Sequence, residues 1–384
     1  MTDNIRKGTL LKNGDDIQAS ILQFFQDAVE KKLFDAVMLP MKVPSGDSFA
    51  WIMIKDAAVL KDAQPLAPIM PVNAATALKR YTRKGKGKFK IAALMKPCEI
   101  RATIELTKLN QVHLDDVTLF TYDCVGALPM QDYIADPEGG DEKFGKLLTD
   151  KNFKSKDVKP VCKICDKFSL SASDLHFAFS DKDILLISNS EKGEKLLTDL
   201  DWKADADLKK WQKHIDEITK IKVKNKTDTF KIVKDMAEGY DNLVETFSNC
   251  IGCHNCSSSC PICYCRQCYF DSSVAKPNSD VVMMRAEERG AASLPLDRIM
   301  FHTGRMAHMS LSCVSCGLCS DACPVNIPVA KIFSYVASQT QKAFEYSAGA
   351  SAGDALPMKE YKLNELGELG ELVKSAEAQE ESNE

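Results

Sequence analysis

The sequence predicts a chain of two unlike parts, an α/β (α+β) N-terminal region and a mostly helical, cysteine-rich region after it. Over residues 1–200, apolar runs bounded by Gly, Pro or Asn alternate with segments of helical periodicity, which is typical of βαβ units. From Cys250 onward the composition changes to Cys, Ser and Pro. The length of 384 residues agrees with two or three domains at about 150 residues each.

The first elements are predicted to be a helix and two strands. Apolar residues recur at helical spacing over residues 17–29, and Asp15 or Asp16 is placed to cap that helix. Apolar runs at 36–39, which a proline ends, and at 48–55 indicate two strands joined by a turn.

A βαβ unit is predicted next. Residues 89–94 indicate a strand, 99–109 a helix and 117–122 a second strand. That order implies parallel strands with a right-handed crossover. A further strand at 183–188 leads into a helix near residues 192–200.

The remaining segments carry weaker signals. Residues 132–152 are predicted to be a loop, residues 203–245 a helical bridge, and residues 371–384 an acidic, disordered tail. We therefore expect an α/β region at 1–200, a helical linker at 201–248, a cysteine-rich domain at 249–345 and an extended tail at 346–384.

The overall composition is that of a soluble globular protein, with 45% hydrophobic and 27% charged residues. The net charge of −4 gives no support to a nucleic-acid or membrane-surface role, and no apolar stretch is long enough to cross a membrane. The polar N-terminus does not resemble a secretory signal. We therefore expect a cytoplasmic protein whose 15 cysteines are metal ligands or redox groups rather than disulfides.

Eight of these cysteines repeat one spacing, C-x2-C-x2-C-x3-C followed by proline. Bacterial ferredoxins hold two [4Fe–4S] clusters by this spacing, with the fourth cysteine of each run bound to the other cluster. Zinc is the alternative, because C-x2-C pairs also suit a tetrahedral zinc site, but two complete runs ended by proline favour clusters. The predicted ligands are Cys250, Cys253, Cys256 and Cys323 for one cluster, and Cys260, Cys313, Cys316 and Cys319 for the other.

Four earlier cysteines form a weaker group. Cys98 opens the helix after the strand at 89–94, and Cys124 follows the next strand, so neighbouring parallel strands would bring both thiols to one sheet edge. With the C-x2-C pair Cys162 and Cys165, they could hold a third [4Fe–4S] cluster. The alternative is that Cys98 and Cys124 are buried apolar residues. Three further thiols either compete with Cys260 or pack inertly, namely Cys263, Cys265 and Cys268.

The turn from Ser190 to Gly193 lies between a predicted strand and helix, where backbone N–H groups can bind phosphate. An ordinary helix cap is the alternative. The sequence contains no G-x-G-x-x-G or Walker A motif, so a standard dinucleotide site is unsupported.

Five segments carry a family resemblance. They read NCIGCHNCSSSCPICYCRQCYFDS at 249–272, HMSLSCVSCGLCSDACPVNIPVAKIF at 308–333, KPCEIRA at 96–102, VCKICDKF at 161–168 and SNSEKG at 188–193. Over roughly residues 15–360 the chain resembles the coenzyme F420 hydrogenase/dehydrogenase beta-subunit family, and within it the beta subunits of F420-dependent formate dehydrogenase. The chain departs from the family pattern at two positions. Asn189 stands where the family has arginine, and Asp166 stands one residue before the position of the aspartate in the family's C-x2-C-x-D-F segment.

The resemblance implies a flavoprotein. Members of the family bind FAD, and many exchange a hydride between FAD and coenzyme F420. By resemblance, the third cluster on Cys98, Cys124, Cys162 and Cys165 would lie next to the flavin, and the flavin contacts would be Lys96, Ser190, Lys192 and Gly193.

The resemblance also implies a function, that of an oxidoreductase subunit in a formate dehydrogenase complex. Formate would be oxidised on a separate catalytic alpha subunit, because nothing in this chain resembles a molybdenum or tungsten site. Electrons would pass between that subunit, the clusters and FAD, with hydride exchange to F420. One alternative is a non-catalytic iron–sulfur adapter that links a dehydrogenase or hydrogenase to a heterodisulfide-reductase-like or bifurcating partner. Another is a zinc-stabilised interaction module.

Overall fold

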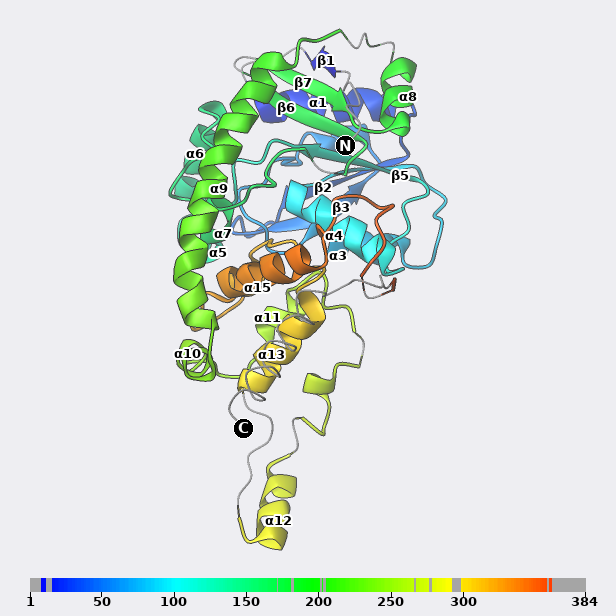
Figure 1. The fold of residues 1–384 in the computed structure, drawn as a ribbon. Coiled ribbons are helices and arrows are strands. Elements are labelled where there is room, and N and C mark those ends of the chain that lie inside the picture. The colour runs from blue at the N-terminus through cyan, green and yellow to red at the C-terminus, as the bar shows by residue number, and fades with distance from the viewer. Residues whose placement is uncertain are drawn as a thin grey trace.

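The computed structural model describes residues 8–11, 16–170, 172–180, 183–200, 202, 205–265, 267–275, 278–291, 298–357 and 359–360. Within these ranges the N-terminal region forms a mixed sheet of seven strands in the order β1-β7-β6-β5-β4-β2-β3 (Figure 1). The strands are β1 (Gly8–Leu11), β2 (Ala36–Lys42), β3 (Phe49–Ile54), β4 (Ile91–Leu94), β5 (Val117–Tyr122), β6 (Leu175–Ser180) and β7 (Asp183–Ser188).

The predicted βαβ unit is confirmed. Strand β4, helix α4 (Pro97–Lys108) and strand β5 follow one another, and β4 pairs in parallel with β5 from Ile91 opposite Val117. Glu99 fixes the start of α4, since its buried carboxylate accepts hydrogen bonds from the backbone N–H groups of Lys96 and Ala74, each at 2.9 Å. The carboxyl ends of β4 and β5 therefore meet at one edge of the sheet.

Helices cover both faces of the sheet. Helix α1 (Ile17–Glu30) packs on one face, and its N-cap is Asp16, as predicted, while Asp15 lies outside the described residues. Helices α3 (Ala74–Thr82) and α4 contribute to a second apolar cluster, which extends into the cysteine-rich region. The two parts of the chain are thus packed together through the α4 face.

Helix α9 (Lys209–Ala237) joins the two apolar clusters. Trp211 and Ile215 near its start pack with the sheet, and Val233 near its end packs with the cysteine-rich region. A helix of 29 residues is about 44 Å long, enough to run beside both parts as Figure 1 shows.

The predicted loop at 132–152 is wrong. The segment forms α5 (Met130–Ala135) and α6 (Pro137–Thr149). Asp136 caps α6 by accepting from the Gly139 N–H, and Pro137 suits its first position. Gly139 and Gly140 are unfavourable in a helix and concealed its pattern in the sequence. Gly140 is nevertheless needed there, since a Cβ would lie 2.5 Å from the Tyr133 ring.

Two strands lie where none was predicted. Strand β1 pairs with β7, and β6 pairs in parallel with β5 and antiparallel with β7. Strand β2 continues through Pro40, beyond its predicted end. Its pairing with β4 covers only Ala36–Met38, so the missing N–H of Pro40 breaks no hydrogen bond to β4.

The second part of the chain is mostly helical. After α10 (Tyr240–Thr246) it contains α11 (Asn255–Ser258), α12 (Ser279–Arg289), α13 (Arg298–Met309), α14 (Leu318–Asp321) and α15 (Val329–Ala343). Residues 346–349 pack against α4, where Glu105 accepts hydrogen bonds from the Tyr346 hydroxyl and the Gly349 N–H. The predicted acidic tail at 371–384 lies outside the described residues.

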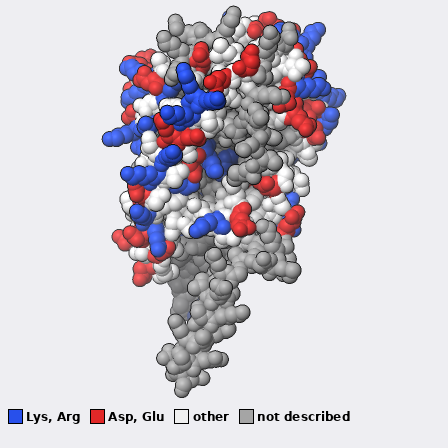
Figure 2. Space-filling view, turned by 45° about the horizontal axis from the view of Figure 1, so that its top comes forward, with Lys and Arg blue, Asp and Glu red and all other residues white. Residues whose placement is uncertain are grey.

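The described surface carries both signs of charge. Figure 2 shows Lys and Arg side chains interspersed with Asp and Glu over one face of the molecule. No helix in the described ranges is long and apolar enough to cross a membrane.

Candidate iron–sulfur sites

The four early cysteines line one cavity at the carboxyl edge of the sheet. Cys98 follows β4 and Cys124 follows β5, and the two strands are parallel neighbours, so both thiols emerge together. Cys162 and Cys165, on and just after α7 (Pro160–Lys163), form the opposite wall. We call this group, Cys98, Cys124, Cys162 and Cys165, the proximal site.

Backbone contacts bring the walls of the proximal site together. Gly126 has a φ of +111°, and a Cβ there would lie 2.8 Å from Val158, so only glycine allows this close approach. The Lys159 N–H donates to the Ala127 carbonyl at 2.8 Å, and the Lys222 ammonium donates to the Cys162 carbonyl at 2.8 Å.

The proximal thiols are partly buried and lie close to one another. Burial raises the pKa of Cys98 well above its usual value and that of Cys124 to about 12, and neighbouring cysteines raise both further. Burial also raises the pKa of Cys162. Such thiols resist ionisation on their own, and a metal supplies the positive charge that makes them thiolates.

Four cysteines of the ferredoxin-type runs line a second cavity, beside the proximal site. We call them the middle site, and they are Cys260, Cys313, Cys316 and Cys319. Cys316 and Ser315 line the proximal cavity as well, so the two sites share a wall. Gly317 has a φ of +86°, and a Cβ there would lie 2.6 Å from Val161. A glycine is thus required where this loop meets α7.

The remaining four cysteines of the two runs form the outer site, Cys250, Cys253, Cys256 and Cys323. Burial raises the pKa of Cys256 to about 11, and the other three thiols of the site raise it too, which places them near one another. Two side chains of α13 reach its sulfurs. His302 Nε2 lies 3.4 Å from Cys250 Sγ, and Arg305 donates to Cys256 Sγ at 3.1 Å.

A single metal ion needs its ligand atoms to converge on one point. Within the described residues, no group of three or more His, Cys, Asp or Glu side chains closes around one ion. In a [4Fe–4S] cluster each cysteine binds a different iron, so its four sulfurs stand farther apart than around one zinc ion.

Of the three unassigned cysteines, one lies beside the middle site. The Cys263 thiol is hydrogen-bonded to Cys260, which together with burial raises the pKa of Cys263. It also contacts the Met309 sulfur at 3.3 Å. Cys265 is exposed and Cys268 is partly buried.

The predicted flavin contacts lie at two opposite edges of the sheet. Lys96 is buried in the wall of the proximal cavity. Ser190, Lys192 and Gly193 lie at the other end of the strands, because β7 runs antiparallel to β6. A six-residue strand such as β5 is about 20 Å long, so the structure does not bring Lys96 together with the other three.

The polar groups of the Ser190 turn have partners within the fold. The Ser190 hydroxyl donates to the Asp174 carboxylate at 2.7 Å and accepts from the Gly193 N–H at 3.1 Å, as a helix cap does. Lys192 donates to the Val117 carbonyl at 2.6 Å. A Cβ on Gly193 would lie 2.3 Å from the Asp174 carbonyl oxygen, so its glycine serves close helix packing.

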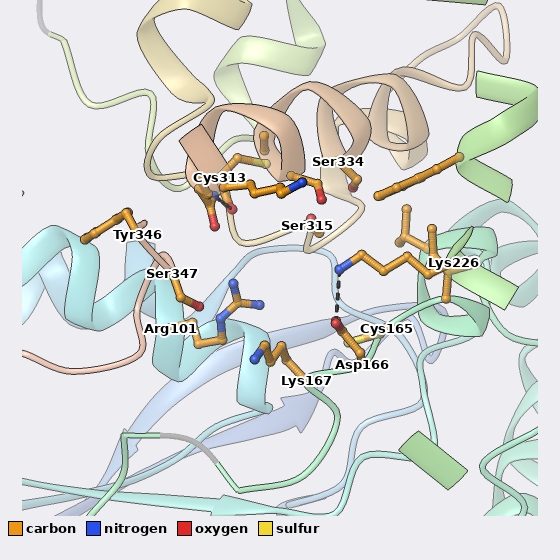
Figure 3. Close-up of a pocket in the computed structure, with 17 residues that line it drawn as sticks. Arg101, Cys165, Asp166, Lys167, Lys226, Cys313, Ser315, Ser334, Tyr346 and Ser347 are labelled. Carbon is orange, nitrogen blue, oxygen red and sulfur yellow. Dashed lines mark hydrogen bonds and ion pairs between the residues drawn. The ribbon is translucent and has the colours of Figure 1, made fainter. Parts of the chain in front are cut away.

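Sequence reasoning missed a basic pocket beside the proximal and middle sites (Figure 3). Cys165 and Cys313 border it, and its lining contains one carboxylate, Asp166, which pairs with Lys226 at 3.1 Å. The Ser334 hydroxyl, 5% exposed, has no hydrogen-bond partner in the described part of the chain. The basic residues that line the pocket are Arg101, Lys167, Lys226 and Lys342. The pocket therefore favours an anionic ligand, and no sequence signal marked it because its residues come from separate segments.

A buried polar cluster next to Cys124 was also missed. The fully buried carboxylate of Asp123 accepts from the Trp211 indole at 2.7 Å and the Phe179 N–H at 2.8 Å, and lies 2.9 Å from His176 Nε2. It fixes the end of β5 to β6 and to α9, and thereby positions the adjacent Cys124.

Comparisons with known proteins agree with the cysteine pattern. The model of a family described as "4Fe-4S dicluster domain" matches residues 246–327. The F420-dependent formate dehydrogenase subunit beta of Methanocaldococcus jannaschii is 24% identical over 370 residues, covering 86% of this chain and 91% of that protein. The F420-dependent formate dehydrogenase 1 subunit beta of Methanococcus maripaludis is 28% identical over 299 residues, covering 68% and 73%.

One solved structure is a weaker match. A chain of the xenon-derivatised F420-reducing [NiFe] hydrogenase complex from Methanosarcina barkeri is 12% identical, with a TM-score of 0.43, covering 60% of this chain and 91% of that chain. A likeness at this level carries no structural conclusion. The sequence relatives confirm the predicted resemblance: this chain, with its mixed α/β region and its helical 4Fe-4S dicluster region, is a homologue of the beta subunits of F420-dependent formate dehydrogenase.

Proposed function

We propose that this chain is the electron-transfer subunit of a formate dehydrogenase-type complex. It passes electrons between a formate-oxidising alpha subunit, three [4Fe–4S] clusters and FAD, and the flavin exchanges a hydride with coenzyme F420. The observation that carries the proposal is the continuity of the cysteine sites, since Cys316 lines both the middle and the proximal cavity.

Each site offers the donor set that a cubane needs, four thiols, and soft thiolates favour iron–sulfur clusters. The outer and middle sites each combine three cysteines of one run with the last cysteine of the other, as in a bacterial ferredoxin. The proposed ferredoxin-type domain is residues 249–345, which includes most of the segment matched by the dicluster family.

The three sites are arranged in series. Arg305 lies between the outer and middle sites, within electrostatic reach of Cys256 and Cys319. The shared wall at Cys316 joins the middle site to the proximal one. Electrons that enter at the outer site would leave at the sheet edge, beside the basic pocket of Figure 3.

We place the FAD next to the proximal site. Lys96 in the cavity wall and the basic pocket at Cys165 both suit an anionic cofactor. A flavin suits this junction because it handles both one- and two-electron steps. The names of the relatives, each a beta subunit of F420-dependent formate dehydrogenase, support F420 and a separate catalytic subunit as partners.

A second candidate is the non-catalytic iron–sulfur adapter, which would link a dehydrogenase to a heterodisulfide-reductase-like or bifurcating partner. One observation favours it. In the Ser190 turn, where Asn189 stands in place of arginine, the Ser190 hydroxyl is already hydrogen-bonded to Asp174 and to the Gly193 N–H as a helix cap. Both candidates need the outer and middle clusters, and they differ in the flavin.

A cofactor analysis separates the two. The full chain, purified without oxygen, is analysed for flavin, iron and acid-labile sulfide. About one flavin and about twelve irons, the content of three cubanes, are expected. About eight irons and no flavin, after purification with added FAD, would favour the adapter. Bound zinc in place of iron would overturn both.

A further inference from the structure

Arg305 is a buried cation between two cysteine sites. It lies on α13, and its side chain is 3% exposed. One guanidinium nitrogen donates to Cys256 Sγ at 3.1 Å and another to the Cys256 carbonyl at 3.0 Å. The guanidinium therefore binds Cys256 of the outer site through both its sulfur and its backbone carbonyl.

The same charge also faces the middle site. Arg305 lines the middle cavity together with Cys260 and Cys319, and its charge interacts with both thiols. The centre of the Phe333 ring lies 4.7 Å from the guanidinium carbon. Among the described residues, the groups that most raise the pKa of Arg305 are cysteine thiols, and its Nε has no hydrogen-bond partner there.

A buried guanidinium without a carboxylate is costly unless another negative charge compensates it. Cluster-bound thiolates carry such negative charges. Reduction adds one electron to the cluster and so increases its negative charge. A hydrogen bond and a fixed cation at a ligand sulfur stabilise the reduced form more than the oxidised form. The placement of Arg305 thus has a direct consequence for the reduction potential.

We propose that Arg305 sets the reduction potentials of the two ferredoxin-type clusters, raising that of the outer cluster most, through its hydrogen bond to Cys256, and that of the middle cluster less. It is a positioning residue rather than a catalytic one. The inference rests on the proposed function, since it needs clusters at these two sites.

The test is a redox titration of the anaerobic full chain with dithionite as the one-electron reductant, followed by EPR. The variants are Arg305→Gln, Arg305→Lys and the control Arg298→Gln, which removes an exposed cation from the same helix. A Cys253→Ser variant identifies the outer signal. Iron content is measured for each.

For Arg305→Gln we expect full iron and an outer cluster about tenfold less reduced at a fixed potential, a 59 mV shift for one electron. The middle cluster should shift the same way by less, and Arg298→Gln should match the wild type. Arg305→Lys keeps the charge but loses the paired hydrogen bonds to the Cys256 sulfur and carbonyl. The potential of the outer cluster should therefore shift by less than in Arg305→Gln.

Unchanged potentials in Arg305→Gln with full iron would overturn this inference and leave the proposed function standing. If Arg305→Gln loses iron, Arg305→Lys decides, because a wild-type outer potential in that variant would overturn the role of the hydrogen bond. A wild-type chain without iron would overturn the proposed function, and this inference with it.

Discussion

Cys98 and Cys316 line the same cavity, although one opens helix α4 of the sheet region and the other belongs to a cysteine run of the helical region. Each is partly buried, and burial raises the pKa of Cys316 to about 12. The thiol of Cys316 also raises the pKa of Cys98, so the two sulfurs are close enough to interact. The junction between the two parts of the molecule is therefore also the junction between two cysteine sites.

Replacing Cys316 with Ser tests this junction. The variant should lose one cubane, about four irons, and electrons supplied at the outer site should no longer reach the proximal cluster. Iron analysis and the rate of flavin reduction by a reduced partner measure the two effects. The exposed Cys265, replaced by Ser, is the matched control and should leave both unchanged. Wild-type rates in Cys316→Ser would contradict the series arrangement.

Gly317 should be needed for the same junction. Alanine there would combine a φ of +86° with a Cβ 2.6 Å from Val161, whereas Gly46 has a φ of +80° and open space around it. We expect Gly317→Ala to lower the unfolding free energy by about 2–4 kcal/mol, through backbone strain and overpacking. Gly46→Ala should cost only the strain, about 1–2 kcal/mol. Equal losses by denaturant titration would mean that the contact with α7 is unimportant.

The sequence predicted those parts of the fold that depend on local spacing. The unit from β4 to β5 has strong apolar runs around a helix that begins at Pro97, and the ferredoxin-type runs have fixed intervals. The capping of α1 by Asp16 is equally local. In each case the physical cause lies within a few residues of the element.

Other features depend on contacts between distant segments, which one sequence does not reveal. Ser190 and Lys96 looked like two sides of one site, but the missed strand β6 makes β7 antiparallel and sends Ser190 to the far edge. No sequence pattern marked Arg305, and only the folded chain brings it to Cys256. The pairing of Lys159 with Asp321 is of the same kind.

The ion pair of Lys159 and Asp321 should stabilise the contact between α7 and α14. The Lys159 side chain is 2% exposed and that of Asp321 10%. Breaking a buried pair from one side leaves a buried charge, so Lys159→Met should cost about 3–5 kcal/mol of unfolding free energy. The double variant Lys159→Met with Asp321→Leu should recover most of that loss, because neither charge is then left alone.

Denaturant titration of the wild type, the single variants Lys159→Met and Asp321→Leu, and the double variant measures this coupling. Lys146→Met is the control, since its pair with Glu142 is exposed and its loss should leave the unfolding midpoint where it is. If the double variant were as unstable as the sum of its single variants, Lys159 and Asp321 would not stabilise each other.

Cys263 should act as a reserve ligand of the middle site, because its thiol is hydrogen-bonded to Cys260. In Cys260→Ser, Cys263 is close enough to take the vacant coordination position, so most of the iron should be retained, with an altered EPR spectrum. Cys263→Ser alone should keep the wild-type iron content. The double variant should lose about four irons, the content of one cubane. Iron content in anaerobically purified protein decides the matter, with Cys268→Ser as the control from the same segment. A Cys260→Ser protein as poor in iron as the double variant would show that Cys263 packs inertly, the other outcome that its position in the sequence allowed.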